Sequence, residues 1–531
     1  MRPFPIRPSF LLPLLLVLAL CCACQRPAIQ STEAPFPYQE ADIAGLQARM
    51  AAGELDSVTL TDAYLRRIAE LDRSGPTLRA VTELNPAARR EAAERDAERR
   101  AGHVRGPLHG MPVLLKDNIA ATPMHNTAGS LALKGFRPGR DAFLVQRLRQ
   151  AGAVILGKTN LSEWANFRST NANSGWSAVG GQTRNPYALE RNPCGSSSGS
   201  AVAVAANFAV VAIGTETDGS ITCPAAVNGI VGLKPTVGLV SRDGIIPISF
   251  SQDSAGPMTR SVADAALLLA AIAGRDEADP ATAAMPGRAV YDYSTRLRSD
   301  ALRGARIGLL RSPLAERPEI KPVIAQAIAT LREAGAIVIE TELPTAGQWE
   351  PDELTVLLHE FKAGLPRHLQ QWQAPVTTLA GLIAFNREHA AQEMPFFGQE
   401  LFEQAEASGE LNDPVYISAR NNARRLAGPE GIDAALRADQ LDALIAPTTG
   451  VAWRTTPGEG DDYPGGSYGA AAVAGYPSLS VPMGHADGLP LGLLFMGTAW
   501  SEPRLLELGY AYEQLTRARR PPAFVSGKPN P

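Results

Sequence analysis

Histidine and cysteine are scarce in this chain. Only seven His and five Cys occur among 531 residues. No cluster of these residues has the spacing of a metal site, so we expect neither a metal nor another cofactor. Three cysteines lie within the first 24 residues, which leaves Cys194 and Cys223 in the remainder. These two could pair, although we favour the interpretation that they are two small buried residues.

A strong excess of either charge is also missing. Lys and Arg number 50 against 54 Asp and Glu, which gives a formal net charge of −4. This balance gives no reason to expect nucleic acid or an acidic membrane surface as a partner. Hydrophobic residues make up 45% of the chain, which is ordinary for a soluble globular protein and ample for a large core.

The N-terminal apolar run at residues 10–20 is too short to span a bilayer comfortably. It follows two arginines and ends in a cluster of three cysteines, which is typical of a secretory signal peptide. The cysteines resemble a bacterial lipoprotein cleavage site, with Cys24 as the lipid acceptor. We therefore expect a signal peptide at 1–24, a linker at 25–38 and a periplasmic protein that touches the membrane only through a lipid. The alternative is an uncleaved anchor.

Strand and helix signals alternate along the rest of the chain. Helices are expected at 141–151 and 322–334, and residues 351–440 are mostly helical in pattern. The order of strands and helices favours an α/β protein, and without a repeat or a linker we expect one domain over residues 39–531. The turn at 485–488 predicts a hairpin between the last two strands. Strands are expected at 111–116, 153–156, 305–310, 336–339, 441–446, 478–483 and 489–496.

Two short motifs suggest other chemistries. Residues 152–159 match the pattern of a phosphate-binding loop, but the residues between the glycines are themselves an expected strand. Residues 195–199 match the nucleophile elbow of an α/β-hydrolase, with Ser197 at the centre. A turn rather than a strand precedes that motif. We favour neither interpretation.

Two glycine- and hydroxyl-rich loops flank an apolar segment. The first contains Ser196, residues 201–213 are expected to form a buried helix, and the second loop ends at Ser220. Such loops can point backbone amides at a developing oxyanion. A serine needs a neighbouring base, and Lys116 at the end of an apolar strand could serve because desolvation lowers the pKa of a lysine. Singly these signals are weak, since a lysine at a strand end is more often ion-paired.

Together, the stretch GMPVLLKDNI around Lys116 and the block at 194–236 (CGSSSGSAVAVAANFAVVAIGTETDGSITCPAAVNGIVGLKPT) resemble the amidase signature family. The resemblance covers roughly residues 40–520. It implies Lys116 as the catalytic base, Ser196 as a bridging serine after a cis peptide bond and Ser220 as the acylated nucleophile. It also implies the amidase signature fold, a single large α/β domain with a central mixed sheet flanked by helices on both faces.

The resemblance further implies that an oxyanion hole is formed by backbone N–H groups of Thr217, Asp218, Gly219 and Ser220. Asp218 stands where the family commonly has glycine. Thr222 stands where many members carry an arginine that pairs with a substrate carboxylate. The loss of that guanidinium favours substrates with an uncharged amide end.

In both departures the chain resembles the peptide amidases, which release ammonia from C-terminal carboxamides of peptides. We therefore expect a small peptide amide as the substrate. Trp164, Asn166 and Asp218 are the candidates for lining the site, although Trp164 and Asn166 could equally serve core packing. A broad-specificity aryl or fatty-acid amidase is the alternative, and other classes are a non-catalytic exported binding protein and an amidotransferase subunit.

Overall fold

The computed structural model describes Met1, residues 36–287 and residues 292–525. The chain divides into two units, residues 1–39 and residues 40–531. Apart from Met1, the expected signal peptide lies outside the described residues, as does nearly all of the expected linker. Among the helices that the structure describes, none combines the length and apolar character needed to cross a membrane.

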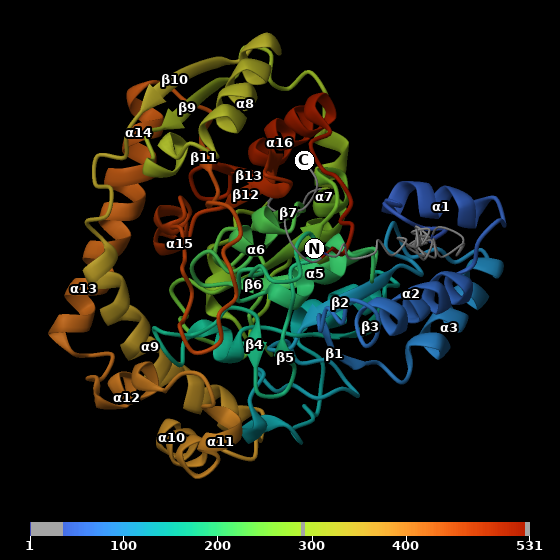
Figure 1. Ribbon diagram of the computed structural model, residues 1–531, viewed down its shortest axis with the longest axis horizontal. Coiled ribbons are helices and arrows are strands. Elements are labelled where there is room, and N and C mark those ends of the chain that lie inside the picture. The colour runs from blue at the N-terminus through green and yellow to red at the C-terminus, as the bar shows by residue number, and fades with distance from the viewer. Residues whose placement is uncertain (2–35, 288–291, 526–531) are drawn as a thin grey trace. The chain divides into compact units, whose positions relative to one another are not determined.

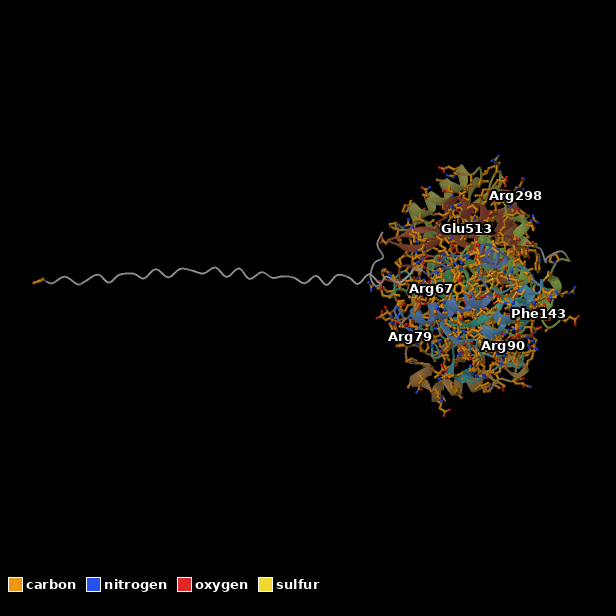
Figure 2. The ribbon with its side chains drawn as sticks, turned by 90° about the vertical axis from the view of Figure 1, so that its right-hand side faces the viewer. Arg67, Arg79, Arg90, Phe143, Arg298 and Glu513 are labelled. Atoms are coloured by element: carbon orange, nitrogen blue, oxygen red, sulfur yellow. A yellow bond between two sulfur atoms is a disulfide. The ribbon has the colours of Figure 1, made fainter. Side chains whose placement is uncertain are left out.

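The second unit is built on an eleven-stranded mixed sheet with the strand order β1-β3-β2-β6-β8-β7-β12-β13-β11-β9-β10. In Figure 1 this sheet runs from β1, β2 and β3 at the lower right to β9 and β10 at the upper left. The side view agrees, because Arg79 before β1 lies low and Arg298 before β9 lies near the top (Figure 2). The strands are β1 Val81–Leu84, β2 Pro112–Lys116, β3 Val154–Thr159, β6 Val211–Glu216, β7 Val231–Lys234, β8 Ser254–Thr259, β9 Arg306–Leu310, β10 Ile337–Thr341, β11 Ala443–Pro447, β12 Ser478–Ala486 and β13 Leu489–Met496, and a separate pair is β4 Trp176–Ser177 with β5 Gly181–Gln182.

Helices flank the sheet, as the resemblance implies. One group, α5 and α6, contacts the central strands, and a second group of mutually contacting helices comprises α4, α7, α8 and α16. A helical region from α9 to α14 lies beside these layers, with α9 against α13 (Figure 1). The helices are α1 Ile43–Ala51, α2 Ser57–Leu71, α3 Ala88–Arg100, α4 Phe143–Gln150, α5 Ser198–Ala205, α6 Thr222–Val227, α7 Val262–Ile272, α8 Lys321–Glu333, α9 Glu350–Gln371, α10 Leu379–Glu388, α11 Ala390–Glu393, α12 Glu400–Ala407, α13 Pro414–Ala427, α14 Asp433–Ala438, α15 Gly469–Ala474 and α16 Glu502–Thr516.

The predicted C-terminal hairpin is confirmed. Strands β12 and β13 pair antiparallel, with Ala486 opposite Leu489. The two residues between them, Asp487 and Gly488, have φ values of 49° and 77°. Positive φ at both positions is what a type I′ turn requires, and aspartate followed by glycine is the pair that adopts it most readily.

The expectation of one buried helix over residues 201–213 is wrong. The segment forms the helix α5, which ends at Ala205, and then the strand β6, which begins at Val211. A segment in which every residue except Asn207 is apolar carries no periodicity that separates a buried helix from a buried strand. The β-branched residues Val210, Val211 and Ile213 fit a strand better than a helix. Both a helix and a strand therefore lie between Ser196 and Ser220.

The sheet brings the predicted lysine to the second serine-containing loop. Strands β2 and β6 are parallel neighbours, with Leu115 opposite Ile213. Lys116 is the last residue of β2, and β6 ends at Glu216. Because parallel strands end at the same edge of a sheet, the loop after β6 lies next to Lys116, at the edge where α/β proteins commonly bind ligands.

Candidate active site

Lys116 is completely buried and has three hydrogen-bond contacts. Its Nζ lies 2.7 Å from Ser196 Oγ, 2.8 Å from Thr215 Oγ1 and 3.1 Å from the carbonyl oxygen of Thr215. Burial lowers its pKa to about 7, although the carboxylates of Asp253 and Glu216 oppose the shift. Near neutral pH a large fraction of this amine is therefore uncharged and able to accept a proton.

Ser196 lies in the loop before α5 and is fully buried. The peptide bond between Gly195 and Ser196 is cis. A Cβ atom on Gly195 would lie 2.1 Å from Ser162 Oγ, so this position has no room for a side chain. The carbonyl oxygen of Ser196 accepts a hydrogen bond from the N–H of Ser162 (3.1 Å), which holds the loop against the segment that follows β3.

Ser220 lies between β6 and α6 and lines a cavity of about 420 Å³. Its side chain makes no hydrogen bond within the described residues, so the hydroxyl is available to a bound molecule. The carbonyl oxygen of Ser220 accepts a hydrogen bond from the N–H of Ser197 (3.1 Å). The two serine-containing loops are thus joined directly, one residue from Ser196.

The loop before Ser220 has unused backbone donors. In the described part of the chain, the N–H groups of Asp218, Gly219 and Ser220 make no hydrogen bond. Thr217 anchors this loop by donating from Oγ1 to Asp253 (2.6 Å). Gly219 has a φ of 74° and lies so close to Tyr468 that a Cβ atom would be 2.1 Å from that ring. These N–H groups beside a nucleophile have the arrangement of an oxyanion hole.

Glu216 fixes the start of α6, directly after Ser220. One carboxylate oxygen of Glu216 accepts hydrogen bonds from the N–H of Ile221 (2.7 Å) and from the N–H of Thr222 (2.9 Å). It also accepts one from the hydroxyl of Thr222 (3.2 Å). Thr222 is therefore held in the interior and provides no cation to a substrate.

The three predicted lining residues have different positions. Asn166 and Asp218 line the cavity of Ser220. Trp164 does not line it: the side chain is 3% exposed and packs edge to face on Phe402, with ring centroids 5.6 Å apart. Trp164 is thus part of the core behind the cavity, which the residue type alone could not reveal.

The cavity lining carries acidic groups. Asp218 and Asp461 line it, whereas the lining includes no Lys, Arg or His. Asp218 is exposed to the cavity, and its position among protein groups, with the nearby carboxylates of Glu353 and Glu216, raises its pKa well above the usual value. Burial also raises the pKa of Asp461, which accepts hydrogen bonds from the N–H of Ser174. The lining therefore offers no cationic side chain to a substrate carboxylate.

The favoured interpretation of two unpaired cysteines is wrong. Cys194 and Cys223 form a disulfide, with their Cα atoms 6.1 Å apart. Both residues are buried, as expected. Their pairing depends on how the loop before Ser196 meets α6, and that contact between distant segments leaves no signal in the local sequence.

The two rejected motifs have structural roles. Strand β3 occupies residues 154–159, so the glycine motif at 152–159 is mostly strand. Ser197 is fully buried, and its Oγ donates to the carbonyl oxygen of Thr215 (2.9 Å). Within the described residues, no group of three or more His, Cys, Asp or Glu side chains is placed to hold a metal ion.

Several residues of the site were not predicted from the sequence. The hydroxyl and the carbonyl oxygen of Thr215 are the two hydrogen-bond partners of Lys116 besides Ser196. Glu216 holds the start of α6. Asp461, Tyr463 and Tyr468 line the cavity from a loop more than 230 residues after Ser220. The motif around Ser220 contains Thr215 and Glu216, but only the pairing of β2 with β6 shows what they contact.

Known proteins resemble this chain over most of its length. The family model described as Amidase matches residues 59–506. A probable amidase of Arabidopsis thaliana is 40% identical over 503 residues, which cover 92% of this chain and 93% of that protein. One component of the glutamyl-tRNA(Gln) amidotransferase of a Synechococcus species is 37% identical over 503 residues, which cover 90% of this chain and 93% of that protein.

A solved structure is more similar still. The native peptide amidase from Stenotrophomonas maltophilia has 70% sequence identity and a TM-score of 0.91. The match covers 93% of this chain and all of that one. The chain therefore belongs to the amidase family of amidase signature enzymes and is a hydrolase that acts on amide bonds.

Proposed function

We propose that this amidase hydrolyses C-terminal carboxamides of peptides and releases ammonia through an acyl-enzyme on Ser220. Uncharged Lys116 accepts the proton of Ser196, and Ser196 accepts that of Ser220 as Ser220 Oγ attacks the amide carbonyl. N–H groups of residues 217–220 stabilise the oxyanion. The proton returns to the leaving nitrogen, the C–N bond breaks, and water then hydrolyses the ester.

The contact between Lys116 and Ser196 is the observation that carries this proposal. An uncharged amine has two N–H groups and one lone pair. Its two N–H groups match the two acceptors that Thr215 offers, at 2.8 and 3.1 Å. The lone pair is then directed to the hydroxyl of Ser196 at 2.7 Å, as a base requires.

The second proton transfer rests on proximity rather than on a formed hydrogen bond. Ser220 Oγ has no partner among the described residues, while the N–H beside Ser196 donates to the carbonyl oxygen of Ser220. Catalytic hydrogen bonds are often long without substrate and shorten when it binds. We propose that the substrate carbonyl draws the hydroxyl of Ser220 into line with Ser196.

The character of the cavity supports a peptide amide as the substrate. A pocket with two carboxyl groups and no basic side chain disfavours glutamine and other substrates with a free carboxylate. This speaks against the chemistry of the related amidotransferase component. The 70% identity to a peptide amidase supports the same substrate class. The alternative, a broad-specificity aryl or fatty-acid amidase, would use the same catalytic groups.

Ammonia release from a substrate panel tests both parts of the proposal. We expect turnover of N-blocked dipeptide amides and much slower turnover of glutamine, aryl anilides and fatty amides. Ser220→Ala should lower the rate by at least about a thousandfold, because the nucleophile is lost. Equal rates on anilides and peptide amides would contradict the proposed peptide-amide specificity and would favour a broad-specificity amidase. A folded Ser220→Ala protein with full turnover would refute Ser220 as the nucleophile.

We further propose export to the periplasm, with an N-terminal leader that is cleaved directly before Cys24 and with Cys24 as the lipid-bearing residue. The disulfide between Cys194 and Cys223 supports an oxidising compartment, because such bonds are rare in the cytosol. Mass spectrometry of the mature N-terminus tests this directly. A lipid-modified N-terminal Cys24 is the expected result, and an intact Met1 in the mature protein would contradict export by cleavage.

A further inference from the structure

The disulfide joins the two chain segments that carry the serines. Cys194 lies two residues before Ser196, and Cys223 lies three residues after Ser220. The cross-link therefore closes a loop of the chain that contains both serines, α5, β6 and the oxyanion loop. A bond placed only for stability could lie anywhere in the molecule, whereas this one spans the two loops whose spacing the proposed proton transfer requires.

Hydrogen bonds also join the two segments, among them one from the side chain of Asn228, just after α6, to the carbonyl oxygen of Pro193 (2.9 Å). The N–H of Ser197 donates to the carbonyl oxygen of Ser220, and Ser197 Oγ bonds to both the N–H and the carbonyl oxygen of Thr215. These contacts align the main chain of the two loops. They leave the side chains of Ser196 and Ser220 without a direct link to each other within the described residues.

Each half of the disulfide is also held by its own surroundings. The N–H of Cys194 donates to the side chain of Asn192 (2.8 Å), and the carbonyl oxygen of Cys194 accepts from Ser198 (2.6 Å). The N–H of Cys223 donates to the carbonyl oxygen of Gly219 (2.8 Å). Because these hydrogen bonds do not involve sulfur, each loop keeps its local course when the cross-link opens. What changes is the constraint between the loops.

We propose that the disulfide between Cys194 and Cys223 is a positioning element of catalysis, which holds Ser196 and Ser220 at the spacing for proton transfer and makes turnover sensitive to dithiols. The inference rests on the proposed function. Opening the cross-link lowers kcat, because a misalignment of the proton path acts on the chemical step. It has little effect on KM, because Asn166 and Asp218 still line the cavity.

The route of reduction is the active-site cavity. Cys194 lines the cavity and is 4% exposed, whereas Cys223 is 1% exposed. A small dithiol such as dithiothreitol reaches Cys194 from there. One thiolate attacks a cystine sulfur and breaks the S–S bond, and the second thiol displaces the mixed disulfide. The cystine gains two electrons and two protons, and the dithiol becomes a cyclic disulfide. A bound substrate therefore protects the bond.

The test compares oxidised enzyme, dithiol-reduced enzyme and the Cys194→Ala/Cys223→Ala double variant. Two controls establish that the reduced enzyme is open and folded: two more thiols titrated per chain than in the oxidised enzyme, and an unchanged near-UV circular dichroism spectrum. Under these conditions we expect kcat to fall at least tenfold and KM to change less than threefold. Reoxidation should restore kcat. The double variant should have the same low kcat and no response to dithiol. If dithiol fails to open the bond, the proposed dithiol sensitivity is refuted, and the double variant alone decides the positioning role.

Two outcomes overturn the inference. One is a reduced or doubly substituted enzyme with full kcat. The other is loss of kcat only together with loss of the folded spectrum, which would make the cross-link a structural staple. Protection is measured on Ser220→Ala, where a saturating peptide amide should slow thiol release at least tenfold, and no protection would exclude the cavity route. Turnover by Ser220→Ala in either redox state would instead refute the proposed function.

Discussion

At the scale of single residues, the proposed mechanism makes the rate depend on the protonation state of the buried Lys116. A lysine that acts as a base works in its uncharged form, and burial lowers its pKa from 10.5 to about 7. We therefore expect log(kcat/KM) to rise with pH up to about 7 and then to level off. Measuring initial rates between pH 5 and 10 tests this. A profile that keeps rising toward pH 10 would mean that Lys116 titrates as an ordinary lysine.

Gly219 allows a sharp test of the oxyanion loop. In Gly219→Ala the new Cβ would lie 2.1 Å from the ring of Tyr468, so the loop must move. We expect kcat to fall by about 10²-fold or more, the size seen when an oxyanion donor is lost. Gly304→Ala is the matched control, because Gly304 also has a φ of 74° but its Cβ would meet nothing within 4 Å. Equal losses in both variants would point to backbone strain alone.

At this scale the sequence predicted three residues that the structure brings to one place, but it did not predict their surroundings. Lys116, Ser196 and Ser220 were each identified from motifs and lie at one edge of the sheet. Asp461 and Tyr468 belong to a distant loop whose approach to Ser220 depends on the whole fold. For Trp164 the sequence left cavity lining and core packing as equal alternatives, and the side chain packs in the core.

At the scale of elements, Arg168 connects the segment beside the cavity to the helical region. Its side chain is fully buried between Glu163 and Glu393, with Nη1 2.5 Å from Glu163 and 3.6 Å from Glu393 at the end of α11. Removing the guanidinium leaves two buried carboxyl groups without their cation. Burial already raises the pKa of Glu163 well above its usual value.

We expect Arg168→Ala to lower the free energy of unfolding by about 3–5 kcal/mol, as for other broken buried ion pairs. Denaturant unfolding measures it. The control is Arg387→Ala, which removes an ion pair to Glu403 whose side chains are 65% and 47% exposed, and which should cost about 0–1 kcal/mol. Similar losses in the two variants would contradict this role for Arg168.

Element types were predictable where the pattern was distinctive. The hairpin of β12 and β13 follows from its Asp-Gly turn, and α8 between β9 and β10 follows from alternating strand and helix signals. Residues 201–213 were assigned to a single helix because every position except Asn207 is apolar. The segment carries a signal for the division that the assignment missed, because Asn207 has a φ of 60° just after α5, where asparagine often ends a helix. Pairing with β2 and β8 then completes β6.

At the scale of the whole molecule, the disulfide should contribute modestly to thermal stability. Its cysteines are 29 residues apart, and a closed loop of that size corresponds to about 3–4 kcal/mol in the chain-entropy account. For a unit of about 490 residues, the unfolding entropy makes 1 kcal/mol equal to about 1 °C in Tm. Calorimetry of the reduced enzyme should therefore find Tm lowered by only about 3–4 °C. A fall of about 15 °C would assign the bond to global stability.

The single large domain and its α/β class were predictable, whereas the strand order was not. Composition, the absence of a linker and the family motifs all indicated one unit, and residues 40–531 form one. The order of eleven strands depends on pairings such as β7 with β12, which are more than 240 residues apart. Hydrophobic pattern identifies a strand but not its neighbour.

The identity of the acylated residue is the most direct test of the account. Enzyme mixed with a saturating peptide amide is quenched in acid during turnover, digested and mapped by mass spectrometry. The account predicts that fragmentation of the digested peptides places the acyl mass on Ser220 and on no other serine. An acyl group on Ser196 or Ser197, or turnover with no covalent adduct in the quenched enzyme, would contradict it.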